Sequence, residues 1–426
     1  MRPFHYYKKL FVAIMLHDQN YDTRPSSLSG SAIPPLKLIL RFAQLITTFP
    51  LSLFAWTLLR VLSIRYQVSI YILKSFRPGW GSTYLNMMEP LCRQLQYENN
   101  PRHIKILVEP GEAVSKVLVK SYEPHFTFYL DDRKKYLRLI AYLIPKSGIE
   151  KKFILKSDKS INNWHQPPSK NFVNLENKLP TDLADFGIDR ENFVLFTHAS
   201  KKYYEKRPES GTVSSMQHRF NNLSTFNLAI EQIFENKLKV VRVGINVDEL
   251  PPALKELSII DYTGEIRKEE GELWLYENCK FLVSATSGAY WFTRRFDRPS
   301  ILMNSYMFPL GFFSTYFTTM LLKNSKSDEL WSFSKTISHR SDSDYLEKSF
   351  LSRHDVEFVP NSPRTILNAV KEMLKLDDPS SSNYQMDDKE LIHRYKEILN
   401  KFQVPVVEEM TLPSISFLRE FQHLLE

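Results

Sequence analysis

Short apolar runs alternate with segments of helical periodicity from Gln67 onward. The first block has apolar runs at 68–73, 104–109 and 126–130. Each run is followed by a segment with helical spacing of its apolar positions, at 84–95, 112–120 and 134–143. Strands that alternate with helices predict a parallel sheet with helices on its faces.

A second alternating block follows residues 156–180, which are rich in Ser, Asn and Pro and have little periodicity. Its pattern predicts five strands, at 192–198, 239–244, 258–263, 280–285 and 299–304. Helices are predicted at 224–235, 270–278 and 289–295, and the C-terminal third is predicted to be mostly helical, at 363–376, 387–402 and 414–425.

The pattern therefore predicts an α/β protein with two Rossmann-like domains, 66–150 and 185–376, joined by a linker at 151–184. A basic and apolar segment at 1–65 precedes them, and C-terminal helices at 377–426 follow. Ligands of such domains bind at the carboxyl ends of the strands, so we expect a cleft site there.

The N-terminal segment carries the excess of positive charge. The chain has a net charge of +8, and residues 1–80 alone hold ten basic and two acidic residues. Between Arg41 and Arg60 lie 18 uncharged residues, broken by Pro50, which is only just enough to span a bilayer. On a helical grid, residues 36–64 form two amphipathic helices with basic residues on the polar side.

These amphipathic helices predict binding in the plane of an anionic membrane surface, on the cytoplasmic face of the inner membrane. A true transmembrane span and packing of the helices on the protein itself are the alternatives. Because the basic residues gather around apolar sequence, nucleic acid is not an expected partner.

The two cysteines, Cys92 and Cys279, exclude a disulfide scaffold and any cysteine-based zinc or iron–sulfur site. The chain also has no GxGxxG dinucleotide motif, HExxH, P-loop or serine-hydrolase elbow.

Several blocks in residues 190–376 carry a resemblance to a known family: FTHASKKYYEKR, HRFNNLSTFNLAIEQIFENKLKVVRVG, IIDYT, ENCKFLVSATSGAYWFTRRFDRPSILMN and EFVPNSPRTILNAVKEML. In their order and spacing they resemble a family of bacterial glycosyltransferases found with surface-polysaccharide genes. The resemblance extends more weakly to residue 60. It implies the two-domain GT-B-like architecture, a nucleotide-sugar donor on the C-terminal side, and a glycan or lipid-linked acceptor.

The chain departs from the family pattern at two positions. Members usually carry His-x-Arg-Asp where this chain has His198-Ala199-Ser200-Lys201, and Gly-His where it has Gly81-Ser82. An arginine and a histidine that would face sugar or phosphate are therefore replaced by Ser200 and Ser82.

The turn Thr286-Ser287-Gly288 is the first candidate for the donor diphosphate. It lies between an apolar strand and a predicted helix. Glycine permits a tight reversal there, and a helix N-terminus offers free N–H groups and partial positive charge to an anion. A simple capped helix start fits the same residues.

Arg219 and Asn221, which precede the helix 224–235, match Arg and Asn of the family pattern, and a guanidinium can pair bidentately with phosphate. Arg242 and Gly244 end a strand on the expected cleft side, where the arginine would reach the nucleotide. The alternatives are a surface arginine with Asn221 or Ser224 as a helix cap, and a solvated strand-end Arg242.

His198 ends a strand and is a candidate base or sugar ligand, although a lone histidine is more often structural. Asp131 and Asp132 end the third strand and are the best-placed carboxylates for deprotonating an acceptor hydroxyl, unless they are a plain loop pair. The acceptor side is expected at the turn after the first strand, at Gly79, Gly81 and Ser82.

No metal or cofactor is expected beyond the nucleotide-sugar substrate. The only Asp-x-Asp, at Asp342 and Asp344, lies in a serine-rich loop with no apolar strand before it. The sequence thus predicts a metal-independent glycosyltransferase. A catalytically inactive GT-B-like protein that binds sugar nucleotides or assembles with a partner is one alternative, and a nucleotide-sugar epimerase on the same fold is another.

Overall fold

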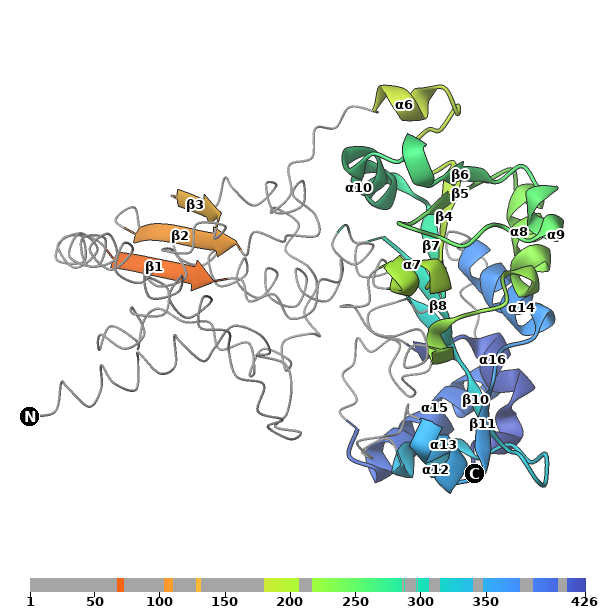
Figure 1. Ribbon diagram of the computed structural model, residues 1–426. Coiled ribbons are helices and arrows are strands. Elements are labelled where there is room, and N and C mark those ends of the chain that lie inside the picture. Colours follow the sequence, from red (N-terminus) through yellow and green to blue (C-terminus); the bar gives the residue numbers. More distant parts are fainter. Residues whose placement is uncertain are drawn as a thin grey trace, which may run out of the picture. The chain divides into compact units, whose positions relative to one another are not determined.

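The computed structural model describes seven longer ranges of the chain: 180–206, 217–285, 298–305, 315–339, 348–375, 386–404 and 412–426, with Ser287 and Phe296. It also describes the strands at 67–72, 103–109 and 128–131 by their backbone (Figure 1). The chain divides into two compact units. The first comprises 1–76, 97–113 and 123–156, and the second comprises 77–96, 114–122 and 157–426.

The N-terminal strands form a parallel sheet. They are β1 (Gln67–Ile72), β2 (His103–Glu109) and β3 (Phe128–Asp131), in the order β1-β2-β3. Gln67 pairs with His103, and Glu109 pairs with Asp131. The three strands and their parallel pairing are those that the apolar runs predict. The helices predicted between them lie outside the described residues.

A second sheet forms the centre of the C-terminal unit. Its strands are β4 (Phe193–Thr197), β5 (Lys239–Val243), β6 (Ile260–Tyr262), β7 (Phe281–Ala285), β8 (Ser300–Ser305), β9 (Tyr316–Thr319) and β12 (Leu412–Pro413). All pairs are parallel, in the order β12-β9-β8-β7-β4-β5-β6. Without β12, this is the 3-2-1-4-5-6 strand order of a Rossmann sheet, which reverses between β4 and β7. The prediction of a Rossmann-like C-terminal domain is confirmed by this order.

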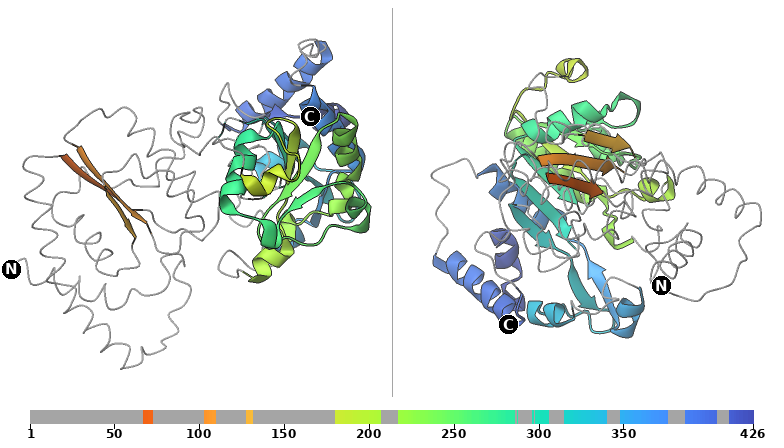
Figure 2. Two further views of the ribbon diagram at one scale, coloured as in Figure 1. Left: turned by 90° about the horizontal axis from the view of Figure 1, so that it is seen from above. Right: turned by 90° about the vertical axis from the view of Figure 1, so that its left-hand side faces the viewer.

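Helices cover both faces of this sheet (Figures 1 and 2). On one face lie α8 (Asn227–Glu235), α9 (Pro252–Lys255) and α14 (Pro363–Leu374), and α8 packs against α14. Their apolar side chains form one buried cluster with those of β4, β7 and β8; Phe196, Ile230 and Ile366 are among its members. On the other face lies α10 (Glu269–Asn278), where Trp274 stacks on Phe193 of β4.

Local sequence explains where several helices begin. Ser362 caps α14 by accepting the N–H of Thr365, and Pro363 takes the first helical position, where its missing N–H costs nothing. The helix predicted at 224–235 begins as a 3₁₀ turn, η7 (Leu223–Phe226), because the Asn222 side chain accepts the N–H of Ser224.

The C-terminal third contains more strand than its pattern predicts. Besides β9, it has β10 (Leu321–Asn324) and β11 (Val356–Val359), which pair antiparallel. Each has only four residues, and their pairing across a long connection leaves no local signal. The helices α12 (Phe333–Ser338) and α13 (Lys348–Arg353) lie between them in sequence.

The last helices dock on the rest of the C-terminal unit through partly buried polar contacts. They are α15 (Met386–Lys401) and α16 (Ile415–Glu420), which follow the predicted positions, although α16 ends earlier than predicted. The guanidinium of Arg419 donates twice to the carboxylate of Asp388, at 2.7 Å each. Glu372 of α14 accepts the N–H groups of Ile415 and Ser416.

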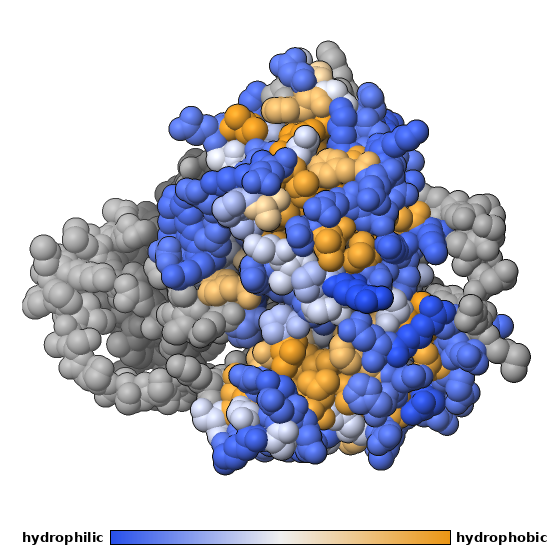
Figure 3. Space-filling view, turned by 90° about the vertical axis from the view of Figure 1, so that its right-hand side faces the viewer, coloured by the Kyte–Doolittle hydropathy of each residue, from blue (hydrophilic) through white to orange (hydrophobic). Residues whose placement is uncertain are grey.

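No helix within the described ranges is both long and apolar enough to cross a membrane. The predicted amphipathic helices at 36–64 lie outside these ranges. The face that carries α8, α9 and α14 shows apolar residues in separate patches among hydrophilic ones (Figure 3).

Candidate functional site

The carboxyl ends of β4 and β7, between which the strand order reverses, mark the place where a doubly wound sheet has its ligand crevice. These two strands are neighbours, with Thr197 opposite Ser284. The next strand after β4 is β5, toward one edge of the sheet, and the next strand after β7 is β8, toward the other edge. Ligands of doubly wound sheets bind at this reversal of strand order. His198 and Ser200 follow β4 directly, and Ser287 follows β7.

The segment that carries Arg219 and Asn221 lies across this crevice. Phe220 pairs with Ala199 beyond the end of β4. The side chain of Asn221 accepts a hydrogen bond of 2.6 Å from Nδ2 of Asn304 in β8. Because β7 lies between β4 and β8, the segment must cross the carboxyl end of β7, where Ser287 lies.

Arg219 belongs to a 3₁₀ turn, η6 (Gln217–Arg219), and its guanidinium lies over the ring of Tyr204, 5.8 Å from the ring centre. Tyr204 lies in α7 (Lys201–Lys206), the short helix that follows β4. Burial, helped by the charge of Arg219, lowers the pKa of His218 to about 4. Arg219 is therefore a cation that lies beside a neutral imidazole.

A buried polar network supports the Asn221 side of the crevice. Asn304 adopts a left-handed backbone conformation (φ 52°), and the β8–β9 register shifts between Leu302 and Ser305. Its Oδ1 accepts the N–H of Asn361 at 2.7 Å, and its own N–H donates to Oγ1 of Thr318 at 3.2 Å. Asn361 in turn accepts from the Thr318 hydroxyl and donates through Nδ2 to the carbonyl of Thr319.

Sequence reasoning missed Asn304, Asn361 and Thr318. The available signal was polar residues at the ends of apolar strands, because side chains there reach the carboxyl edge of the sheet.

Ser287 is 7% exposed, and its hydroxyl lies 3.4 Å from the hydroxyl of Ser284. Ser284 donates to the carbonyl of Ala285 at 2.8 Å. The Ser287 hydroxyl thus lies beside the end of β7, and its predicted contact with the donor diphosphate stays a prediction. Its neighbours Thr286 and Gly288 lie outside the described residues, so their predicted contact with the donor stays a prediction.

Arg242 is not the solvated strand-end residue that the sequence left open, because its side chain is 1% exposed. Its Nη1 donates to Oδ2 of Asp261 at 3.2 Å, and its Nη2 donates to Nε2 of His198 at 3.1 Å and to the carbonyl of Asp248. The guanidinium is therefore engaged inside the protein. Direct contact of Arg242 with a nucleotide stays a prediction.

His198 is 5% exposed and has both ring nitrogens engaged. Nδ1–H donates to the carbonyl of Ala199 at 3.1 Å, and Nε2 accepts from Arg242, an assignment that follows from the hydrogen-bond network. Burial, followed by the charge of Arg242, lowers its pKa to about 4. His198 is therefore neutral at pH 7, and its predicted part as a base stays a prediction.

The loop after β5 needs Gly244. This residue has φ +146°, a region that side chains rarely adopt, and an added Cβ would lie 2.6 Å from Cγ1 of Val247. Ser200, which stands where the resembled family has an arginine, donates its hydroxyl to the carbonyl of Asn246 in this loop at 2.9 Å. The two loops after β4 and β5 are thus joined by Ser200.

Of the remaining candidate residues, the structure describes the backbone of Asp131 alone. Asp131 is the last residue of β3, at the carboxyl end of the N-terminal sheet, as predicted. The others lie outside the described residues: Gly79, Gly81, Ser82, Asp132, Asp342 and Asp344. Within the described ranges, no group of three or more His, Cys, Asp or Glu side chains is placed to hold a metal ion.

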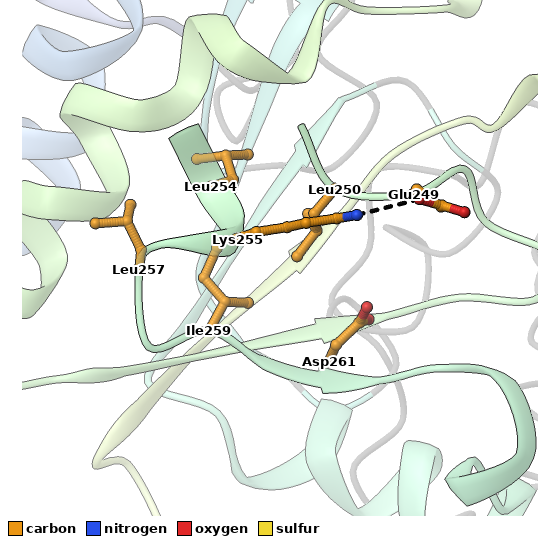
Figure 4. Close-up of a pocket in the computed structure, with 7 residues that line it drawn as sticks. All are labelled: Glu249, Leu250, Leu254, Lys255, Leu257, Ile259 and Asp261. Carbon is orange, nitrogen blue, oxygen red and sulfur yellow. Dashed lines mark hydrogen bonds and ion pairs between the residues drawn. The ribbon is translucent and has the colours of Figure 1, made fainter. Parts of the chain in front are cut away.

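A separate hollow of about 300 Å³ lies beside α9 (Figure 4). Four aliphatic residues and three charged ones line it: Leu250, Leu254, Leu257, Ile259, Glu249, Lys255 and Asp261. Lys255 pairs with Glu249 at 3.1 Å, so its charge is already matched. Two carboxylates and one paired lysine do not favour an anionic ligand, and the hollow is therefore not our candidate for the donor phosphates.

No family model matches this chain. No curated protein matches it either. Three solved structures are similar over much of their length. ADP-heptose LPS heptosyltransferase II of E. coli is 14% identical, with 60% of this chain and 90% of that chain covered and a TM-score of 0.39. A glycosyl transferase family 9 protein from Veillonella parvula is 14% identical, with 60% and 86% covered and a TM-score of 0.40.

The iron-containing dodecameric glycosyltransferase TibC from enterotoxigenic E. coli is 13% identical, with 74% of this chain and 78% of that chain covered and a TM-score of 0.39. With TM-scores below 0.5 and identities below 15%, these likenesses assign neither activity nor ligand to this chain.

Proposed function

We propose that this protein is a glycosyltransferase that moves a sugar from a nucleotide-sugar donor to a glycan or lipid-linked acceptor in the synthesis of a surface polysaccharide. One observation carries the proposal. The segment of Arg219 and Asn221 and the turn residue Ser287, which the family resemblance assigns to the donor side, come from distant parts of the sequence, and the 3-2-1-4-5-6 strand order brings both to the carboxyl ends of β4, β7 and β8. Doubly wound sheets bind nucleotides at this place.

Transfer of the sugar requires that the negative charge on the departing nucleoside diphosphate be stabilised. We propose this part for Arg219, with the backbone N–H groups after Ser287 as further donors. Such fixed donors work without a metal ion, and we therefore propose a metal-independent transfer that survives EDTA.

Deprotonation of the acceptor hydroxyl needs a base. His198 has a pKa of about 4 and both nitrogens engaged, whereas Asp131 ends a strand at the edge of the N-terminal sheet. We therefore favour Asp131 or the adjacent Asp132 as the base, and we propose that the acceptor approaches Gly79, Gly81 and Ser82.

The decisive experiment is a screen for hydrolysis of common nucleotide sugars, followed by calorimetric titration of the full chain with the matching nucleoside diphosphate. Arg219→Ala should lower turnover by a factor of about 10²–10³, as expected for the loss of one charge-stabilising donor. Gly288→Val should strongly weaken nucleotide binding, and Ser287→Ala should weaken it only mildly, because backbone donors remain. Unchanged affinity in both Arg219→Ala and Gly288→Val would place the donor elsewhere.

We further propose that residues 36–64 attach the enzyme to the cytoplasmic face of the inner membrane. The basic excess of residues 1–80 and the amphipathic pattern support this. Deletion of residues 1–64 should move the protein from the membrane pellet to the soluble fraction, and high salt should partly release the intact chain. An intact chain found wholly in the soluble fraction would overturn the anchor.

A second candidate is an inactive GT-B-like protein that binds sugar nucleotides. It is favoured by Ser200, whose hydroxyl is bonded to the neighbouring loop where the resembled family has an arginine. Tight nucleotide binding without turnover of any donor in the screen would support this candidate. An epimerase on the same fold would instead convert the donor sugar without an acceptor.

A further inference from the structure

Arg242 and Asp248 join three segments at the carboxyl edge of the C-terminal sheet. The buried guanidinium of Arg242 in β5 bonds to His198 after β4, to Asp261 in β6, and to the main-chain carbonyl of Asp248. Asp248 lies in the loop that leaves β5. The two ends of this loop are thereby fixed, at Gly244 by backbone conformation and at Asp248 by Arg242.

The Asp248 side chain reaches back to the element after β4. Its Oδ2 accepts the N–H of Lys201 at 2.9 Å, and its Oδ1 accepts the N–H of Lys202 at 3.1 Å. These are the first two residues of α7. A carboxylate at this place satisfies N–H groups that have no partner within the helix and offsets the helix dipole.

One loop therefore holds the whole turn between β4 and α7. Two residues before Asp248, Asn246 accepts the Ser200 hydroxyl through its carbonyl, and its side chain accepts from Nζ of Lys206 at 3.3 Å. These four hydrogen bonds, donated by residues 200, 201, 202 and 206, are all accepted by Asn246 or Asp248. The Asp248 carboxylate also occupies the first N–H groups of α7, so a donor phosphate does not find them free.

We propose that Asp248 is a positioning residue of the donor site. It acts through the start of α7 on Tyr204, the ring over which the Arg219 guanidinium lies, while Asn246 of the same loop holds Ser200. Arg242, which is itself bonded to His198, holds the main-chain carbonyl of Asp248. This proposal rests on the proposed function, because it takes Arg219 as a donor ligand.

The direction in which the nucleotide affinity changes when Asp248 is removed distinguishes this proposal from a simple electrostatic effect. Asp248 is a negative charge beside a site for an anion, so its removal alone should raise the affinity for a nucleoside diphosphate. Loss of positioning should lower that affinity instead. Glu249 is a matched control, since it is the next residue, carries the same charge, and pairs with the exposed Lys255 at 3.1 Å.

The experiment titrates the full chain and its variants Asp248→Ala, Asp248→Asn and Glu249→Ala with UDP, ADP, GDP and CDP, and records a thermal melt of each. We expect Asp248→Ala to bind the preferred nucleotide about ten-fold more weakly. Asp248→Asn, which keeps one acceptor for the α7 N–H groups and the main-chain carbonyl for Arg242, should recover most of the affinity. Glu249→Ala should bind as wild type or slightly more tightly.

A lower melting temperature of Asp248→Ala with unchanged or raised nucleotide affinity would overturn the proposal and leave Asp248 as a helix cap alone. An equal loss in Glu249→Ala would also overturn it, since the effect would then not come from the contacts of Asp248. Failure of wild type to bind any of the four nucleotides would instead refute the proposed function, and this inference with it.

Discussion

Asn221 and Asn304 are 83 residues apart in sequence and are joined side chain to side chain, with Nδ2 of Asn304 donating to Oδ1 of Asn221 at 2.6 Å. Asn221 also donates through Nδ2 to the carbonyl of Arg219 at 3.0 Å. The backbone that carries Arg219 is therefore tied to the end of β8. This link fixes the Arg219 backbone relative to the carboxyl end of β8, the strand next to β7.

Two substitutions of Asn304 should distinguish the energetic cost of its left-handed backbone from the contribution of its side-chain hydrogen bonds. Asn304→Ala puts a Cβ-bearing residue without local hydrogen bonds into the left-handed region and removes two buried side-chain bonds, so we expect the free energy of unfolding to fall by about 3 kcal/mol. Asn304→Gly removes the same bonds without the backbone cost, and should lose about 1 kcal/mol less. Urea unfolding measures both, and equal losses would show that the φ of 52° carries no cost.

Below pH 6.5, His198 should make the protein less stable. Its pKa in the folded state is about 4, below the ordinary 6.5. Between these two pH values the unfolded chain therefore binds a proton at His198 that the folded chain does not bind. Stability from this group is complete above pH 6.5 and is lost as the pH falls toward 4, by about 2 kcal/mol between pH 7 and pH 5.

The variant His198→Gln keeps an acceptor for Arg242 but does not titrate. Its urea midpoint should therefore fall less than that of wild type between pH 7 and pH 5. An identical fall in both proteins would mean that other groups cause it, His218 foremost, whose pKa is lowered to about 4 as well.

Arg242 should matter more for stability than an exposed cation. Arg242→Met leaves the acceptors His198 and the Asp248 carbonyl without their donor, so we expect a loss of about 3 kcal/mol in the free energy of unfolding. Lys255→Ala breaks only the surface pair with Glu249 and should cost less than about 1 kcal/mol. Comparable losses in the two variants would contradict the buried role of Arg242.

Gly244 should resist replacement for two separable reasons. Gly244→Ala forces a side chain to φ +146° and brings its Cβ to 2.6 Å from Cγ1 of Val247, which we expect to cost about 1–3 kcal/mol. Adding Val247→Ala to this variant removes the contact but not the backbone strain. The double variant should thus recover only part of the loss, as measured by thermal or urea unfolding. Complete recovery would assign the whole cost to Val247.

The apolar runs determined the strands β1 to β8 and their parallel pairing, because a buried strand of a parallel sheet must be apolar on both faces. They also located the ends of β4 and β7, and with them His198 and Ser287. The short strands β10 and β11 had no comparable signal, since four residues with mixed exposure acquire their pairing only from the tertiary fold.

The tertiary structure decided what the polar residues at those strand ends do. From the sequence, Arg219 before a helix and Arg242 at a strand end were both candidate cations for the donor phosphates. Packing buries one beside His198, Asp261 and Asp248, and leaves the other over Tyr204 at the crevice. The same holds for Asn304, whose link to Asn221 depends on the order of the strands. A side chain's partners are set by which distant segments the sheet brings together, and a linear pattern does not contain that order.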